Sequence, residues 1–212
     1  QDNMIETAHS TEPRLGVPIH SLYADHRKPT PEMLEGIDYL VVDLQAVGTR
    51  VYTYIWTLLL CLEACAECGV SVLVLDRPNP LGGETVEGPR LDPAFASFVG
   101  LLPIPMRHAL TIGELASWFL EARGLDCRLE VVRMKGWRRS TLWSDLGRSW
   151  VPTSPNLPRF EGCLIYPGQV LLEGTTLSEG RGTTTPFEIC GAPDLDGHEL
   201  AAEMRALGVG PE

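Results

Sequence analysis

The chain has 212 residues, of which 44% are hydrophobic and 21% charged, which is typical of a globular protein with a buried core. Its formal net charge of −11 argues against a nucleic-acid partner, because proteins that bind phosphate backbones cluster Lys and Arg. No apolar run is long enough to cross a membrane, so no membrane span is predicted. The sequence starts at Gln1 and its first Met is Met4, and we expect it to be a piece of a longer protein.

The first half of the chain has a strand–helix–strand pattern. A short helix should begin after Thr30, with Pro31 at its first position. Residues 38–44 form an apolar run typical of a buried strand, and a mostly apolar helix is predicted over about 53–68. The next strand is predicted at 70–75. This order favours a parallel βαβ unit with a right-handed crossover.

A capping box, Thr111 to Glu114, predicts a second helix that runs to about Arg123. Residues 129–134 then alternate as a strand does. We expect the three strands to be parallel neighbours in one sheet of an α/β fold. The connections 77–110 and 135–170 are rich in Pro and Gly and are predicted to lack regular structure, which in a compact domain usually marks a functional role.

Three of the six cysteines have the spacing of iron–sulfur ligands. Cys61, Cys65 and Cys68 form a C-x3-C-x2-C pattern, but the pattern falls within the predicted apolar helix. Because such positions share one helix face, we expect all three thiols to be inert core groups. Neither the remaining cysteines nor the five His residues show metal-ligand spacing, so no metal or cofactor is predicted.

Polar side chains follow the carboxyl ends of the first two predicted strands, where open α/β sheets bind their ligands. Those that could converge on one crevice are Asp43, Gln45, Arg50, Asp76, Arg77 and Asn79. The alternative for the two aspartates is a helix cap or a turn acceptor. Glu114 is explained by its capping box alone.

The segment 175–188 is the most polar of the chain. It holds Glu179, Arg181 and Glu188 with five Thr and one Ser in fourteen residues, and Glu173 lies just upstream. Glycines flank Arg181 and allow the backbone to approach a ligand closely. The segment therefore predicts a binding site for a hydroxyl-rich ligand, with a solvated loop as the alternative.

Many segments in collinear order resemble one protein family. They include Asp43-Leu-Gln45, Arg77-Pro-Asn-Pro-Leu-Gly-Gly83 and Ser178-Glu-Gly-Arg-Gly182, together with 21–23, 50–54, 86–89, 97–100, 103–105, 111–116, 136–137, 154–156 and 166–168. These resemble the NamZ family of exo-acting peptidoglycan β-N-acetylmuramidases over nearly the whole chain. The resemblance implies a Rossmann-like N-terminal domain, here 1–150, and the beginning of a smaller C-terminal domain, 151–212, with the site in the cleft between them.

The resemblance further implies hydrolysis of terminal β-1,4-linked N-acetylmuramic acid from peptidoglycan-derived muropeptides or amino-sugar disaccharides, in a bacterial envelope or secreted protein, with the cytoplasm also possible. Glycoside hydrolysis uses two carboxyl groups, and the candidates in this chain are Glu179 and Asp43. Candidates for substrate binding are Gln45, Arg50, Tyr52, Arg77, Asn79, Arg107, Asn156, Glu173, Thr175, Ser178 and Arg181. The four arginines among them are candidates for the lactyl carboxylate of muramic acid.

The sequence departs from the family pattern at three positions, where Ala46, Ala109 and Thr176 replace an acidic residue, a Gly and an Asn. Family members also carry an E-H-G segment, with the favoured catalytic Glu, upstream of the point where this sequence begins. We therefore expect the full-length protein to be active and the 212-residue piece to be inactive alone. The alternatives are an inactive amino-sugar-binding module and a sugar-nucleotide or phosphosugar enzyme.

Overall fold

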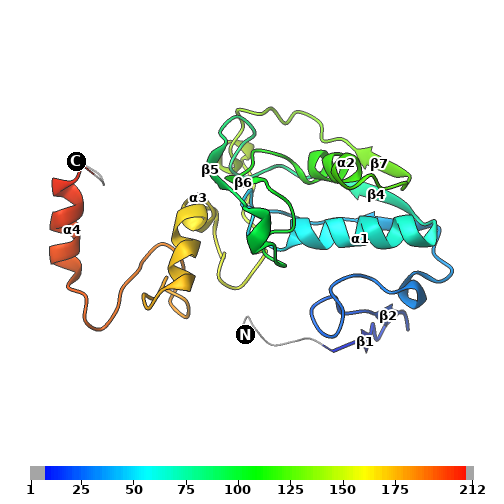
Figure 1. Cartoon of the computed structure of the whole chain (residues 1–212), viewed down its shortest axis with the longest axis horizontal. Coiled ribbons are helices and arrows are strands. Elements are labelled where there is room, and N and C mark those ends of the chain that lie inside the picture. The colour runs from blue at the N-terminus through cyan, green and yellow to red at the C-terminus, as the bar shows by residue number, and fades with distance from the viewer. Residues whose placement is uncertain (1–7, 209–212) are drawn as a thin grey trace. The chain divides into compact units, whose positions relative to one another are not determined.

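The computed structural model describes residues 8–208, and the chain divides into two compact units between Ser149 and Trp150. The first unit holds a three-stranded sheet and the two longest helices (Figure 1). The second unit consists of two helices and irregular segments. None of the described helices is long and apolar enough to cross a membrane.

The central sheet consists of β3 (Tyr39–Val42), β4 (Ser71–Leu75) and β7 (Leu129–Val132), in the order β3-β4-β7. Both pairings are parallel, with Tyr39 opposite Ser71 and Val72 opposite Leu129. The predicted α/β fold with a parallel sheet is thus confirmed. Each strand is one to three residues shorter than predicted.

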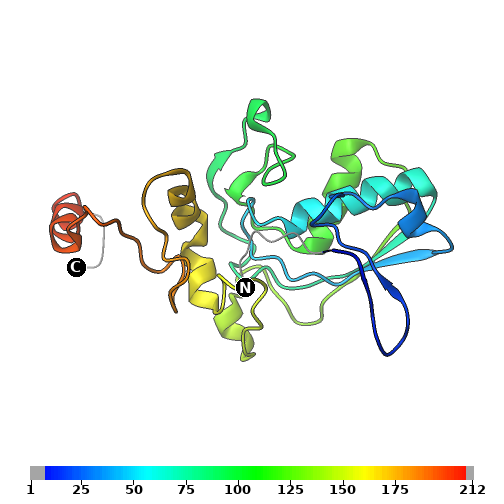
Figure 2. The ribbon, with the colours of Figure 1, turned by 90° about the horizontal axis from the view of Figure 1, so that it is seen from below.

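The two main helices pack on the same face of the sheet (Figure 2). Both crossovers step in the same direction along the sheet, and right-handed connections then place their helices on one side. The covered face carries Leu40, Val42, Val72, Val74, Leu129 and Val131. On the other face Tyr39, Val41 and Val132 remain 44%, 52% and 48% exposed, so β3 is not the fully buried strand that its apolar run predicted.

Helix α1 (Tyr54–Cys68) supplies most of the core. Its side chains Ile55, Trp56 and Leu58 are fully buried, and the Trp56 ring lies 5.8 Å from the Phe119 ring of the second helix. The helix ends at Gly69, which adopts a left-handed φ of 69° that L-residues with a side chain disfavour.

Helix α2 (Ile112–Arg123) begins with the predicted capping box. The Thr111 hydroxyl accepts from the Glu114 N–H, and the Glu114 carboxylate accepts from the Thr111 N–H. Arg139 forms an ion pair with the same carboxylate. The structural interpretation of Glu114 is therefore confirmed. The 3-10 helix η1 (Pro31–Leu34) likewise follows Thr30, although the Thr30 side chain forms no capping bond.

The prediction that 77–110 and 135–170 lack regular structure is wrong. The first contains β5 (Glu87–Arg90), the 3-10 turn η2 (Pro93–Phe95) and β6 (Pro105–Arg107), with β5 and β6 paired antiparallel. The second contains η3 (Trp143–Leu146) and α3 (Phe160–Gln169). Short elements with Pro at their ends or interior, such as Pro105 and Pro167, carry a weak periodicity that sequence patterns miss.

The prediction for the thiols is correct for Cys61 and Cys65 and wrong for Cys68. The first two are buried, and burial raises the pKa of each thiol to about 12, so neither is reactive at neutral pH. Cys68 shares their helix face but is the last residue of α1, beyond the edge of the core, and is exposed.

The remaining elements lie toward the ends of the chain. A short hairpin joins β1 (Ser10–Thr11) to β2 (Pro18–Ile19). In the second unit α3 continues into η4 (Val170–Gly174), and α4 (Gly197–Ala206) begins at the capping residue Asp196. Between η4 and α4 the described chain forms only an isolated bridge of Ser178 with Gly191.

Candidate active site

At the carboxyl ends of β3 and β4, Asp43 and Arg77 form an ion pair. Arg77 Nε donates to Asp43 Oδ1 at 2.6 Å. The Asp43 side chain is 49% exposed and the Arg77 side chain 43%. The hydrogen bond from Arg77 lowers the pKa of Asp43, and the same bond raises the pKa of Arg77. Asp43 is therefore ionised at neutral pH, which suits a base or a stabiliser of positive charge better than an acid.

Asp76, at the end of β4, has a structural role as a cap of helix α2. Its carboxylate accepts from the Thr111 hydroxyl at 3.1 Å and from the Gly113 N–H at 2.8 Å, at the amino end of α2. A Cβ at position 113 would lie 2.6 Å from Val131 Cγ1 and 3.0 Å from Asp76 Cγ, so the close packing at the start of α2 requires Gly113. Of the two interpretations of Asp76, the capping role is the one that the structure shows.

Four other candidates in the first unit are held by contacts within the protein. Arg50 is buried and donates through Nη1 to the carbonyls of Pro89 and Ile104, each at 2.8 Å. Asn79 is buried and bonds Leu110 and Leu81.

Arg107 pairs with Glu87 and also donates to the Leu81 carbonyl. The Tyr52 side chain is buried against the ring of Tyr54. These contacts favour structural roles for the four residues.

The side-chain amide of Gln45 is hydrogen-bonded through its nitrogen, whereas its oxygen has no partner among the described residues. Its amide nitrogen donates to the carbonyls of Ala46 and Pro78 at 2.8 and 2.9 Å, which fixes the orientation of the side chain. Its Oε1 is buried and accepts no hydrogen bond within residues 8–208. A buried acceptor without a partner is rare in folded proteins, so it can bind a donor such as a hydroxyl or an amide N–H.

Other side chains of the first unit have such atoms too, and of these residues Thr49 and His108 were not singled out by sequence patterns. Among the described residues Thr49 Oγ1, Arg50 Nε, Arg107 Nε and His108 Nε2 are also buried without a partner, and 49 and 107 face each other in an isolated bridge. His108 Nδ1 accepts from the Leu110 N–H at 3.2 Å, which leaves its proton on Nε2. Burial lowers the pKa of His108 to about 4, so the ring is neutral at pH 7.

Next to His108, Ala109 has a φ of 58°, which is unusual for a residue with a side chain. It occupies the position where the resembled family has a Gly. Strained residues tend to cluster at functional sites, so the strain marks this segment in the structure. In the sequence, the family motif at Ala109 is the signal that could have identified it.

In the second unit, Arg181 lies between two carboxylates. Its Nη2 donates to Glu173 Oε1 at 2.6 Å, and its Nε donates to Glu179 Oε1 at 2.8 Å. The two carboxylates differ in access, because the Glu179 side chain is 8% exposed and that of Glu173 42%. In this arrangement, called the carboxylate cluster below, Arg181 holds the two carboxylates together.

A tightly bonded loop supports the carboxylate cluster. The Phe187 N–H donates to the Glu179 carbonyl at 2.6 Å, and Phe187 has a strained φ of 64°. Gly180 has a φ of 83°, and a Cβ there would lie 2.8 Å from Ile189 Cγ1, so only Gly fits. Ser178 Oγ accepts from the Gly180 N–H, and Thr175 Oγ1 bonds within its own turn.

Tyr166 is a member of the cluster that sequence reasoning missed. It is buried, and its ring contacts Phe187 edge-on at 4.7 Å. Burial raises the pKa of its hydroxyl, and the charges of Glu173 and Arg181 act on it in opposite directions. For Glu173 itself, burial raises the pKa, the charge of Glu179 raises it further, and Arg181 opposes both.

Two other candidates of the second unit lie outside the cluster. Asn156 is buried, and its Nδ2 has no partner in the described part of the chain. Glu188 pairs with Arg159 through two hydrogen bonds and does not contact Arg181.

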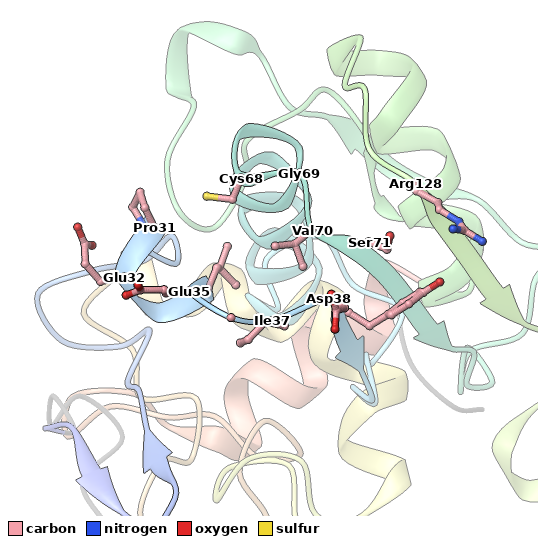
Figure 3. A pocket seen from close by; sticks show the side chains of 13 residues that line it. Pro31, Glu32, Glu35, Ile37, Asp38, Cys68, Gly69, Val70, Ser71 and Arg128 are labelled. Carbon is pink, nitrogen blue, oxygen red and sulfur yellow. The ribbon is translucent and has the colours of Figure 1, made fainter.

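A pocket of about 750 Å³ lies at the opposite, amino ends of the three strands (Figure 3). Asp38, Cys68 and Arg128 line it, and Arg128 lies over the Tyr39 ring at 6.0 Å. None of the candidate site residues reaches it. Because ligands of open α/β sheets bind beyond the carboxyl ends of strands, the pocket's size does not make it the site. Over residues 8–208, no group of three or more His, Cys, Asp or Glu side chains could hold a metal ion.

Known proteins match the chain over both units. The family described as "Exo-beta-N-acetylmuramidase NamZ, N-terminal" matches residues 1–161, and its C-terminal counterpart matches residues 164–210. The chain is 51% identical over 194 residues to the "Peptidoglycan beta-N-acetylmuramidase NamZ" of Bacillus subtilis (strain 168), covering 92% of this chain and 47% of that protein.

Two crystal structures of DUF1343 family proteins from Bacteroides fragilis NCTC 9343 are similar in fold. One matches with a TM-score of 0.89 at 40% identity, over 94% of this chain and 53% of that one. The other has a TM-score of 0.79 at 41% identity, over 88% and 51%. The chain thus spans about half the length of these relatives. On the matches to both of its parts, the chain belongs to the NamZ family of exo-β-N-acetylmuramidases.

Proposed function

We propose that the full-length protein is an exo-β-N-acetylmuramidase that releases terminal β-1,4-linked N-acetylmuramic acid from the non-reducing end of peptidoglycan fragments. The observation that carries the proposal is the 51% identity to the Bacillus subtilis peptidoglycan β-N-acetylmuramidase over 92% of this chain. The geometry of the second unit supports the proposal as well, because Arg181 joins Glu173 and Glu179 in the carboxylate cluster.

The chemistry of the described groups suits a glycosidase. Glycoside hydrolysis needs a carboxylic acid at the leaving oxygen and negative charge near the sugar carbon that becomes positive. Among the described residues, the candidates for such carboxyl groups are those of the carboxylate cluster and the ionised Asp43. Neutral hydrogen-bonding atoms such as Gln45 Oε1 and His108 Nε2 suit sugar hydroxyl and acetamido groups.

The lactyl carboxylate of muramic acid requires a cation. Arg50 is buried, Arg107 is held by Glu87 and Leu81, and Arg181 already faces two carboxylates. Arg77 is half exposed, and its ion pair with Asp43 is formed through Nε. Its Nη groups are therefore the best placed to bind a substrate carboxylate.

The test is hydrolysis of a chromogenic β-N-acetylmuraminide by the full-length protein, beside the corresponding β-N-acetylglucosaminide, which lacks only the lactyl group. We expect release from the first and little from the second. A second assay follows N-acetylmuramic acid released from peptidoglycan oligosaccharides of known ends. Equal rates on both chromogenic substrates, or no release from either, would contradict the proposal.

A further inference from the structure

We propose that Glu173, and not Glu179, is the carboxyl group of the cluster that transfers a proton to the glycosidic oxygen, while Glu179 positions Arg181. The inference rests on the proposed function and assigns roles within it. It differs from the expectation from the sequence, in which the family's favoured catalytic Glu lies upstream of Gln1 and Glu179 and Asp43 are the candidates within this chain.

Access separates the two carboxylates. A group that transfers a proton must come within hydrogen-bonding distance of the substrate. The Glu179 side chain is 8% exposed, its Oε1 is bound by Arg181, and its backbone is fixed by the bond from Phe187. The Glu173 side chain is 42% exposed and, within residues 8–208, is bound through Oε1 alone, so its Oε2 can carry the proton.

Charge separates them further. Arg181 is the one cation that bonds either carboxylate in the described chain, so with both carboxylates ionised the cluster has a net charge of −1. Protonation of one carboxyl group relieves their repulsion, and the proton goes to the one that solvent and substrate reach. The groups facing Glu173 are Arg181, Glu179 and the hydroxyl of Tyr166, and burial with the charge of Glu179 raises the Glu173 pKa against Arg181.

The step is balanced. Glu173 gives its proton to the glycosidic oxygen, which leaves with the electron pair of the C1–O bond as the hydroxyl of the departing sugar. Positive charge develops at C1 while the cluster changes from neutral to −1, and the hydrogen bond from Arg181 becomes an ion pair, which stabilises the new carboxylate. A water molecule then adds to C1 and releases a proton, which restores the Glu173 carboxyl group.

The experiment compares two substrates of the full-length protein that differ in leaving group. From a 4-nitrophenyl β-N-acetylmuraminide, the nitrophenolate leaves without being protonated. In the β-1,4-linked disaccharide of N-acetylmuramic acid and N-acetylglucosamine, the departing sugar needs a proton from an acid. We expect Glu173→Gln to lower kcat/KM at least about 100-fold on the disaccharide and less than about 10-fold on the nitrophenyl substrate. The loss of disaccharide hydrolysis at high pH should also disappear in Glu173→Gln.

Two further variants keep the result interpretable. Glu188→Gln removes a paired carboxylate of the same segment that does not contact Arg181, and should retain the wild-type ratio of the two rates. Glu179→Gln should slow both substrates alike, because it displaces Arg181. If Glu173→Gln slows both substrates equally, or neither, while its melting temperature is unchanged, the proton-transfer role is wrong. If the wild-type protein hydrolyses neither substrate, the proposed function itself fails.

Discussion

The polar groups at the strand ends and those of the carboxylate cluster are similar in type but differ in what they bind. At the strand ends Asp76 caps a helix, and Arg50 and Asn79 bond backbone carbonyls. In the cluster Glu173, Arg181 and Glu179 bond one another. A regular scaffold leaves backbone groups at its ends that polar side chains must satisfy, whereas an irregular loop can leave its charged side chains for a ligand.

The ion pairs of Arg181 with Glu173 and Glu179, and the ion pair of Arg77 with Asp43, provide the strongest test of this difference. In the full-length protein, Arg181→Ala leaves the buried Glu179 without its cation beside a second carboxylate, and should cost about 3 kcal/mol of stability, the low end for breaking a buried pair. Arg77→Ala removes a half-exposed pair and should cost less than about 1 kcal/mol. Chemical denaturation of both variants measures the two values.

The effect of Arg77→Ala on activity should be larger than its effect on stability. Arg77→Ala should raise KM for the muraminide while stability changes little, because Arg77 is the proposed partner of the lactyl carboxylate. Equal losses of stability in the two variants would show that the two pairs do not differ as described.

A smaller effect concerns pH and the buried His108. Its folded pKa of about 4 lies below the ordinary value of 6.5, so the unfolded chain binds more protons between these values. Stability from this group is complete above pH 6.5 and is lost as pH falls toward 4, by about 1.4 kcal/mol per pH unit or about 2 kcal/mol at pH 5. The stability difference between wild type and His108→Gln should therefore shrink on acidification; a constant difference would place the ring in a solvated setting.

The smallest expected effect comes from the strained Ala109. Ala109→Gly removes the steric cost of a φ of 58° and should stabilise the protein by about 0.5–1 kcal/mol, the steric gain being partly offset by the greater freedom of the unfolded chain. The same change in the middle of α2, Ala116→Gly, should destabilise it by about 1 kcal/mol or more. Thermal unfolding of both variants distinguishes a strained position from a general effect of glycine.

Sequence patterns predicted the sheet well because its signals are local. The apolar runs, the capping box of Thr111 and the terminal Gly69 each specify structure within a few residues. The exposed face of β3 could not be predicted in this way, because an apolar run shows that a strand is buried somewhere and does not show which faces are covered.

The site was predicted less completely for a related reason. The composition of 173–188 revealed Glu173, Glu179 and Arg181 as a group, but their partners and burial decide their roles, and these depend on the folded loop. His108 and Tyr166 were missed because a single His or Tyr in an apolar context has no pattern of its own. His108 is notable for its buried Nε2 without a partner in the described chain, and Tyr166 for the nearby charges of Glu173 and Arg181.

The pairing of the arginines has a kinetic consequence. Arg77, Arg107, Arg159 and Arg181 each face a carboxylate, and the chain as a whole has a net charge of −11. The net negative charge of this part of the protein should therefore repel an anionic sugar at long range, because a nearby carboxylate offsets the charge of each of these four arginines. Added salt screens that repulsion, so the second-order rate of substrate capture should rise with ionic strength, opposite to proteins that steer anions with unpaired cations.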